Sequence, residues 1–395
     1  MRFCVLCGYR GEEGRMYPGE SIIVLGGVPF ESKANQTSLQ MTREISKTLD
    51  VWYLCRSTQR PRRDPSGLLR TAVSFRNWRS TYRTIDRNLH VVTLPRLFDF
   101  VPLAFPAWWR KVVSIYLLHV VRAMIRKYDI VNPGLLAYWW FFPEIVSLET
   151  WRFRIFDIID RHWDPSANRR DDRRWRQHLK YVLRTSDAAD ATFVVSPALR
   201  DELETFGVFT CCAENGGDLE QIASIDPGGH RNRVAVYAGG INGRIDFDLL
   251  NNTVESNPDW LFIVAGGGPR LCEISDAPNL HKLGNVDYED VLRILKASAV
   301  GIIPFRESEY VDSSSLMKLV DYLACGVKVV VTPAVHLGRI ADAAGEQILV
   351  VERSAWSDAF QGLGSVVSNE DLDLSSFSVQ ARSSRMLGIV AEVSP

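Results

Sequence analysis

Short apolar runs that end in glycine alternate with helical stretches along most of this chain. The run SIIVLGG (residues 21–27) precedes a stretch with helical spacing, LQMTREISKTL (39–49), and a second apolar run, DVWYLC (50–55), follows directly. An order of strand, glycine loop, helix and strand is typical of a doubly wound parallel sheet. The sequence therefore predicts an α/β fold.

The same alternation starts again in the second half of the chain. RVAVYAGG (233–240) is a predicted strand with a glycine loop, FDLLNNTVESNP (247–258) a predicted helix, and DWLFIVAGGGP (259–269) the next strand and loop. We therefore expect two Rossmann-like domains facing across a cleft, over residues 1–215 and 228–374. Residues 375–395 are expected to be weakly helical and to pack back toward the first domain. The Arg-rich stretch 61–87 is expected to be irregular.

Length and composition narrow the class of protein. A chain of 395 residues is long enough for two hydrophobic cores. With 46% hydrophobic residues, 24% charged residues and a net charge of −1, the composition is that of a globular protein and argues against wholesale nucleic-acid binding. Seven cysteines, an odd number, favour reduced thiols, and Cys4 and Cys7 lack the second pair that a zinc site needs.

We expect a cytoplasmic protein, either free or peripheral on the inner face of the cell membrane. The first 20 residues do not contain the apolar run of a secretory signal, and no stretch reaches the roughly 18 apolar residues of a spanning helix.

The segment VDSSSLMKLVDYLACGVKVVVTP (311–333) carries the clearest chemical signal. It predicts a serine-rich loop, a short helix, a glycine stop and a buried strand. The first N–H groups of such a helix suit a phosphate, and Lys318 adds a positive charge. Asp321 lies one turn further on, where its carboxylate can accept hydrogen bonds from ribose hydroxyls. A helix capped by a serine explains Ser313–Ser315 equally well.

Four segments resemble the GT-B glycosyltransferases of the family 4-like, group 1 kind. SSSLMKLVDYLACGVKVVVTP (313–333) is similar to that family's P-x-K-x-x-E-Y-x-A-x-G-x-P-V-V segment, and ENGGDLE (214–220) to its N-G-V-D element. LAYWWFFPEI (136–145) and RIFDIIDRHWDPS (154–166) resemble a sub-group with W-x-x-P and Y-D-x-x-D in the first domain. The motifs are similar to those of the membrane-associated glucuronosyltransferase of xanthan synthesis and of related exopolysaccharide or teichuronic acid glycosyltransferases.

This resemblance implies an acceptor-binding first domain, a second domain that binds a nucleotide-sugar, and no cofactor beyond the UDP-sugar donor. Together with the loop positions, it assigns the acceptor to Gly27, Glu31 and Asn35. The residues expected to bind the donor are Gly239, Gly240, Arg244, Gly267, Asn285, Glu307, Ser314, Ser315, Met317, Lys318 and Asp321.

Two departures from the family pattern bear on the mechanism. Asp321 stands where many relatives carry Glu, and Ser313 stands where retaining relatives carry a second Glu. The resemblance therefore favours an inverting, metal-independent reaction, which needs a general base. Asp160 follows a predicted strand and is expected at its carboxyl end, facing the cleft; its alternative role is a cap for the next segment. His162 is the rival base, although a lone histidine is more often structural.

Residues 102–128, PLAFPAWWRKVVSIYLLHVVRAMIRKY, place basic residues beside aromatic and aliphatic ones. This pattern fits a helix on an anionic membrane surface. A core helix with solvated basic residues fits equally well.

We thus predict a glycosyltransferase that moves a sugar from a UDP-sugar, with UDP-glucuronate one candidate, to a lipid-linked or glycan acceptor in polysaccharide synthesis. The alternatives are a non-catalytic partner subunit that binds nucleotide-sugars, or a nucleotide-sugar 2-epimerase.

Overall fold

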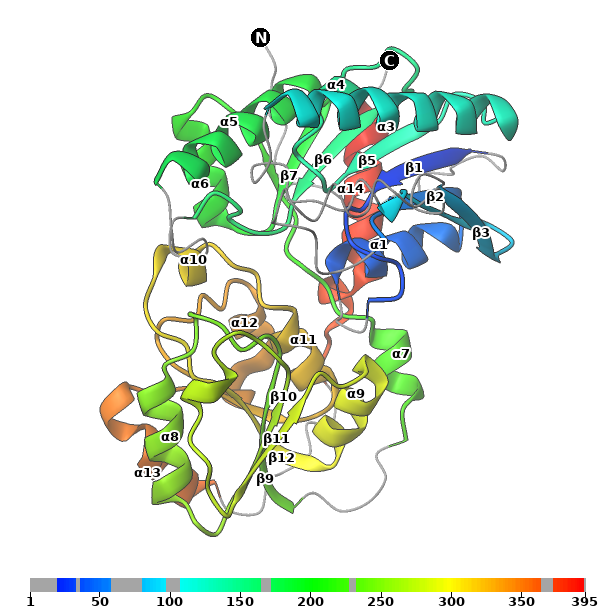
Figure 1. Cartoon of the computed structure of the whole chain (residues 1–395). Helices are drawn as coiled ribbons and strands as arrows, with labels where there is room; N and C mark the ends of the chain where they lie inside the picture. The colour runs from blue at the N-terminus through cyan, green and yellow to red at the C-terminus, as the bar shows by residue number, and fades with distance from the viewer. Residues whose placement is uncertain are drawn as a thin grey trace.

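Two α/β lobes stack one above the other, each built on its own sheet (Figure 1). The computed structural model describes residues 20–32, 36–57, 80–96, 107–164, 172–226, 232–363 and 372–393. In the described part of the first lobe, the sheet has the order β3-β4-β2-β1-β5-β6-β7-β8, and all neighbours are parallel except β3 and β4. Its strands are β1 (Ser21–Leu25), β2 (Asp50–Cys55), β3 (Thr81–Asp86), β4 (Leu89–Thr93), β5 (Gly134–Ala137), β6 (Arg154–Ile158), β7 (Ala191–Val194) and β8 (Cys211–Cys212).

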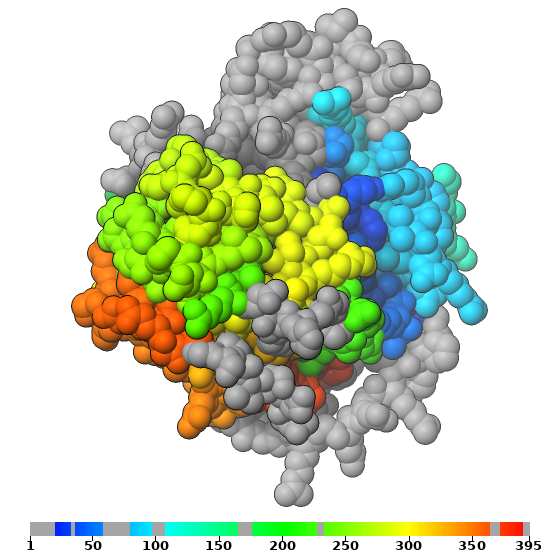
Figure 2. All heavy atoms as spheres, turned by 90° about the horizontal axis from the view of Figure 1, so that it is seen from below, coloured from blue at the N-terminus to red at the C-terminus, as the bar shows by residue number. Residues whose placement is uncertain are grey.

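The sheet of the second lobe is parallel throughout its described strands, in the order β11-β10-β9-β12-β13-β14. These strands are β9 (Asn232–Ala238), β10 (Leu261–Ala265), β11 (Leu280–Gly284), β12 (Ser298–Ile303), β13 (Lys328–Val331) and β14 (Ile348–Val350). Seen from below, the green-to-orange atoms of this lobe cover much of the surface, with blue and cyan segments of the first lobe beside them (Figure 2). The predicted α/β class with two parallel sheets is confirmed.

Helices connect the strands in both lobes, as parallel neighbours require. In the first lobe they are α1 (Thr37–Ser46), α3 (Ala107–Lys127), α4 (Pro143–Val146), α5 (Asp172–Ala188) and α6 (Pro197–Thr205). After the connecting helix α7 (Leu219–Ser224), the second lobe contains α8 (Phe247–Ser256), α9 (Tyr288–Lys296), α10 (Glu309–Asp312), α11 (Met317–Ala324), α12 (Ile340–Ala344) and α13 (Trp356–Gly362).

One strand contradicts the sequence prediction. The expectation that residues 61–87 are irregular is wrong for Thr81–Asp86, which form β3, an antiparallel edge strand paired with β4. Every residue of β3 is exposed. A strand without a buried face leaves no apolar periodicity to detect, so only its pairing defines it.

The last helix, α14 (Val379–Val393), returns to the first lobe after the chain has completed the second. Val379, Met386 and Leu387 are buried in the same core cluster as residues of β1 and β2, and Figure 1 shows the helix (red) behind the first sheet. Arg382 donates to Asp157 on β6 at 2.8 Å and to the Ala213 carbonyl at 3.2 Å. Both charged side chains of this pair are almost fully buried.

Substituting Arg382→Met should therefore lower the free energy of unfolding by about 3–5 kcal/mol, because Asp157 would be left as an uncompensated buried charge. Urea denaturation at pH 7 measures this loss. Arg385→Met, an exposed position on the same helix, is the matched control and should change stability by less than about 0.5 kcal/mol. Equal effects of the two substitutions would show that the buried pair does not anchor α14.

Candidate functional site

A cavity of about 580 Å³ lies between the two lobes. Its volume falls in the range of small-molecule sites. Residues from the carboxyl ends of strands in both sheets reach it, as expected for ligand sites in open α/β sheets. The first lobe contributes Glu31, Gln36, Thr37, Ile159, Asp160 and Asn215. Most of the lining comes from the second lobe, including Tyr237, Gly239, Gly240, Arg244, Gly267, Asn285, Tyr288, Ser314, Ser315, Met317, Lys318 and Asp321.

Helix α11 begins at this cavity without a side-chain cap. Its N-cap residue is Leu316, whose side chain accepts no hydrogen bond. The serines before it are engaged elsewhere, since the Ser313 and Ser314 hydroxyls both donate to the Tyr310 carbonyl, at 3.1 and 2.6 Å. The alternative of a helix capped by a serine is therefore wrong, because the N-cap residue of α11 is Leu316, which offers the first turn no side-chain hydrogen bond.

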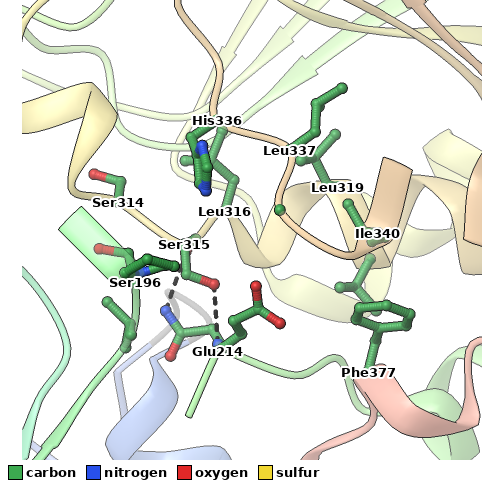
Figure 3. A pocket seen from close by; sticks show the side chains of 15 residues that line it. Ser196, Glu214, Ser314, Ser315, Leu316, Leu319, His336, Leu337, Ile340 and Phe377 are labelled. Atoms are coloured by element: carbon green, nitrogen blue, oxygen red, sulfur yellow. Dashed lines mark hydrogen bonds between the residues drawn. The ribbon is translucent and has the colours of Figure 1, made fainter. Parts of the chain in front are cut away.

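The first lobe holds the loop that precedes α11. The Asn215 backbone N–H donates to Ser315 Oγ at 3.0 Å, and Asn215 Nδ2 donates to the Ser315 carbonyl at 3.1 Å (Figure 3). The Ser196 hydroxyl donates to the Ser313 carbonyl at 2.7 Å. A small cavity of about 30 Å³ beside these bonds is lined by residues of both lobes.

The Lys318 ammonium sits against aromatic side chains rather than a carboxylate in the described part of the chain. Its Nζ lies 3.1 Å from the Tyr237 hydroxyl and 4.2 and 4.9 Å from the ring centres of Tyr237 and Phe305. Burial lowers the pKa of Lys318 to about 7; the positive charge of Arg244 adds to this effect and Asp321 opposes it. A lysine in this state gains from any anion that enters the cavity.

Two glycines leave room for the side chains they face. Gly239 has φ +142°, and a Cβ there would lie 2.8 Å from Lys318 Nζ. A Cβ on Gly267 would lie 2.6 Å from Asn285 Oδ1. A side chain at either position would displace the neighbouring polar group, Lys318 Nζ or Asn285 Oδ1, or project into the cavity.

Asp321 lies one helical turn after Lys318 and is buried. Its Oδ1 accepts a hydrogen bond from the Tyr288 hydroxyl at 2.9 Å. Burial raises the pKa of Tyr288, and the Asp321 carboxylate raises it further. Tyr288 therefore stays a neutral donor to Asp321.

Asp160 contacts the second lobe directly across the cavity. Its Oδ2 accepts from Arg244 Nη2 at 3.0 Å and from the Tyr310 hydroxyl at 2.6 Å. The Arg244 guanidinium lies over the Tyr310 ring, 4.0 Å from its centre. The sequence predicted Asp160 and Arg244 as site residues but not their contact, and Tyr310 was missed because no motif singles it out.

Three predicted residues lie outside the cavity lining, and a fourth is not described. Gly27, Glu307 and His162 are not among the residues lining the cavity. Glu307 is exposed, and His162 stacks on Trp140 with ring centres 3.9 Å apart. Burial lowers the pKa of His162 to about 4, against the opposing effect of Asp160. Asn35 is outside the described residues. The roles assigned to these four residues stay predictions.

The described residues also bear on metal binding and on contact with membranes. No group of three or more His, Cys, Asp or Glu side chains is arranged there to hold a metal ion. Within the same ranges, none of the helices combines the length and apolar character needed to cross a bilayer.

The match to a known protein family falls on the second lobe. Residues 237–365 match the family described as glycosyl transferases group 1. Over 212 residues the chain is 27% identical to the putative teichuronic acid biosynthesis glycosyltransferase TuaH of Bacillus subtilis (strain 168), covering 48% of this chain and 53% of that protein. The chain thus matches about half the length of this curated relative.

Solved structures match nearly the whole chain at low identity. Sucrose-phosphate synthase from Thermosynechococcus elongatus gives a TM-score of 0.60 at 11% identity, over 95% of this chain and 96% of that one. The E. coli trehalose-6-phosphate structure bound with UDP-2-fluoro glucose gives a TM-score of 0.56 at 10% identity, over 95% of this chain and 96% of that one. The N-terminal domain of Candida albicans trehalose-6-phosphate phosphatase gives a TM-score of 0.63 at 10% identity, over 98% of this chain and 99% of that one. These matches confirm the predicted GT-B fold.

The lowered pKa of Lys318 makes the stability of the ligand-free protein depend on pH. Between about pH 7 and the ordinary lysine value of 10.5, the unfolded chain holds a proton that the folded protein has lost. The free energy of unfolding should therefore rise with pH in this window, by up to about 1.4 kcal/mol per unit. Lys318→Met should abolish this rise, so the wild type gains stability relative to the variant between pH 7 and 9. Urea denaturation at both pH values measures it.

Lys111→Met, an exposed position on α3, is the control for the loss of one lysine and should keep the rise. A wild-type pH dependence identical to that of Lys318→Met would contradict the buried, poorly compensated state of this ammonium.

Proposed function

We propose that this protein is a glycosyltransferase that binds a UDP-sugar between its lobes and transfers the sugar to a lipid-linked or glycan acceptor. The observation that carries the proposal is the start of α11 at the inter-lobe cavity, where the helix has no side-chain cap and Lys318 and Asp321 line the wall. The group 1 match over the same lobe supports it.

The diphosphate is the part of the donor that these groups suit best. Lys318 gains a full charge beside an anion, and the N–H groups at the start of α11 add the positive end of the helix dipole. Arg244 lines the same cavity and provides a planar, charged donor for phosphate oxygens. Gly239 and Gly240 let the loop backbone approach the phosphates closely.

The nucleoside then extends along the second lobe. Asp321, already paired with Tyr288, accepts hydrogen bonds from the ribose hydroxyls. The wall formed by Gly267 and Asn285 takes the base. No acid occupies the position of the retaining relatives' second Glu, since Ser313 stands there, buried, with its hydroxyl on the Tyr310 carbonyl.

The reaction is therefore proposed to invert the anomeric centre. Asp160 removes the proton from the acceptor hydroxyl while the acceptor oxygen bonds to the anomeric carbon, and the bond from that carbon to the UDP oxygen breaks. Lys318, Arg244 and the start of α11 stabilise the charge that develops on UDP. No step requires a metal ion. A non-catalytic subunit or a 2-epimerase is not favoured by any contact in the cavity.

The acceptor is proposed to belong to polysaccharide synthesis. TuaH is described as a teichuronic acid biosynthesis glycosyltransferase, which supports a glycan or lipid-linked glycan as acceptor. UDP-glucuronate is the first donor to test, because the motifs resemble those of a glucuronosyltransferase.

Two measurements test the function. Calorimetry gives the affinity for UDP, and the release of UDP from a panel of UDP-sugars, UDP-glucuronate first, gives the turnover. Lys318→Met should weaken UDP binding by about 1.5–3 kcal/mol, the value of a charged hydrogen bond. Asp160→Asn should not weaken UDP binding but should lower turnover by at least about 100-fold, because it removes the general base.

Lys328→Met, on β13 of the same lobe and outside the cavity lining, is the control and should leave both properties unchanged. Failure of UDP and other nucleoside diphosphates to bind would refute the proposed function. Normal turnover in Asp160→Asn would remove that residue from the mechanism.

Helix α3 is the proposed contact with the membrane surface. It lies along the outer edge of the first lobe, away from the second lobe (Figure 1). Trp108, Val112 and Ile115 form an apolar stripe on it, 61%, 41% and 67% exposed. The helix contains no acidic residue, and its exposed basic residues are Lys111, Arg122, Arg126 and Lys127.

The structure corrects part of the predicted membrane face. Arg110 is buried and forms an ion pair with Glu144 at 2.9 Å, and Trp109 is buried in the core. The remaining stripe and basic side chains suit an anionic bilayer, with a glycan acceptor presented from its surface. The protein is thus proposed to be peripheral on the cytoplasmic face.

Flotation with phosphatidylcholine vesicles containing phosphatidylglycerol should carry the wild type to the top fraction, and high salt should reduce this. The double substitution Trp108→Ser with Ile115→Ser should reduce binding several-fold, because it removes the apolar contact. Phe209→Ser, which changes a side chain 75% exposed on another surface, is the control. A wild type that stays with the dense fraction would contradict the membrane contact.

A further inference from the structure

Asp160, the proposed base, is engaged by two donors in this structure. Arg244 Nη2 donates to both carboxylate oxygens, at 3.0 and 3.3 Å, and the Tyr310 hydroxyl donates to Oδ2 at 2.6 Å. Both donors belong to the second lobe, whereas Asp160 belongs to the first. A carboxylate with these two donors on it is poorly placed to take a proton from a third group.

A second ion pair stands beside this contact. Arg161 Nη1 lies 2.7 Å from Glu309 Oε2 across the same boundary. Arg161 is fixed within the first lobe by two bonds to Glu202, at 2.8 and 2.9 Å, and one to Asp164 at 2.7 Å. Two consecutive residues of one lobe therefore pair with two consecutive residues of the other. We call Asp160, Arg161, Arg244, Glu309 and Tyr310 the clasp.

Arg244 is the cationic member of the clasp that lines the proposed nucleotide site, as Asp160 also does. It lines the inter-lobe cavity together with Gly240 and Lys318, and its positive charge contributes to the lowered pKa of Lys318. Its Nε is buried and has no hydrogen-bond partner among the described residues. A buried charged group with an unused donor in a cavity indicates a ligand that is bound at another stage.

We propose that a nucleoside diphosphate opens the clasp by competing with Asp160 for Arg244, and that Tyr310 then keeps the freed carboxylate in position. The inference rests on the proposed function and adds the order in which the two substrates bind. A diphosphate carries more charge than a carboxylate and accepts a bidentate guanidinium. Donor binding therefore precedes productive acceptor binding, because Asp160 becomes a base only after Arg244 has left it.

This mechanism assigns Tyr310 a positioning role. Its ring stays under the Arg244 guanidinium at 4.0 Å while its hydroxyl bonds to Asp160. When Arg244 shifts to the phosphates, the Tyr310 hydroxyl is the remaining donor of the clasp on that carboxylate. It orients the carboxylate without contacting the reacting atoms.

Calorimetric titration with UDP, in a cycle of Asp160→Asn and Arg244→Ala, tests the competition. Removing the competitor by Asp160→Asn should tighten UDP binding at least about fivefold when Arg244 is present. In the Arg244→Ala background the same substitution should change the Kd less than twofold. Asp312→Asn, which removes a negative charge from the same short helix as Tyr310, is the charge control and should have no effect.

Simple repulsion between Asp160 and the diphosphate makes a different prediction, because the gain would persist without Arg244. That result, or an unchanged Kd in Asp160→Asn, would overturn the clasp while leaving the proposed function intact. If neither UDP nor any other nucleoside diphosphate binds, both proposals fail.

Tyr310→Phe tests the positioning role, because it keeps the ring and removes the hydroxyl. We expect kcat to fall about tenfold with the KM for the donor changed less than twofold, and the free energy of unfolding to stay unchanged. A fall in stability with unchanged kcat would show that Tyr310 is merely structural and would overturn its assignment.

Discussion

The hydrogen bonds between Asn215 and Ser315 fix the site, because they join the two lobes at the start of α11. Asn215 lies where the chain leaves the first lobe, and it binds Ser315 through both its backbone and its side chain. Its Oδ1 accepts from the Thr37 hydroxyl at 3.1 Å, which connects this junction to the first helix. The position of Lys318 relative to Asp160 therefore follows from contacts of the linker as well as from the packing of each lobe.

The sequence predicted the features that depend on neighbours in the chain. Buried parallel strands such as β1 and β2 are continuous apolar runs, and the spacing of Lys318 and Asp321 places both on one side of a helix. The sequence prediction failed where the role of a residue depends on a hydrogen-bond partner in a distant part of the chain. The serines before α11 were compatible with a cap until the Tyr310 carbonyl and Asn215 proved to bind them. Tyr310 itself has no local pattern, since its role comes from Asp160, 150 residues away.

The buried pair of Asp157 and Arg382 connects the fold to the chemistry. Asp157 lies on β6, three residues before Asp160, so α14 holds the strand whose end presents the proposed base. A buried ion pair as a whole adds little net stability compared with apolar side chains of similar volume, even though the loss of one partner alone is costly. Its role here is positional, because it ties the returning helix to the strand that leads to Asp160.

The outgoing and returning segments of the chain connect the lobes at a place apart from the clasp. Gly217 pairs with Phe377 and Val379 through backbone hydrogen bonds of 2.9 Å each, so the outgoing and returning segments run side by side. A Cβ on Gly216 would lie 2.5 Å from the Ser378 carbonyl, so this approach requires glycine. In Figure 1, α10 lies toward the left of the boundary between the lobes, and these segments lie to the right of it. The clasp is therefore a second connection between the lobes, and the proposed release of Arg244 from Asp160 would leave these paired segments intact.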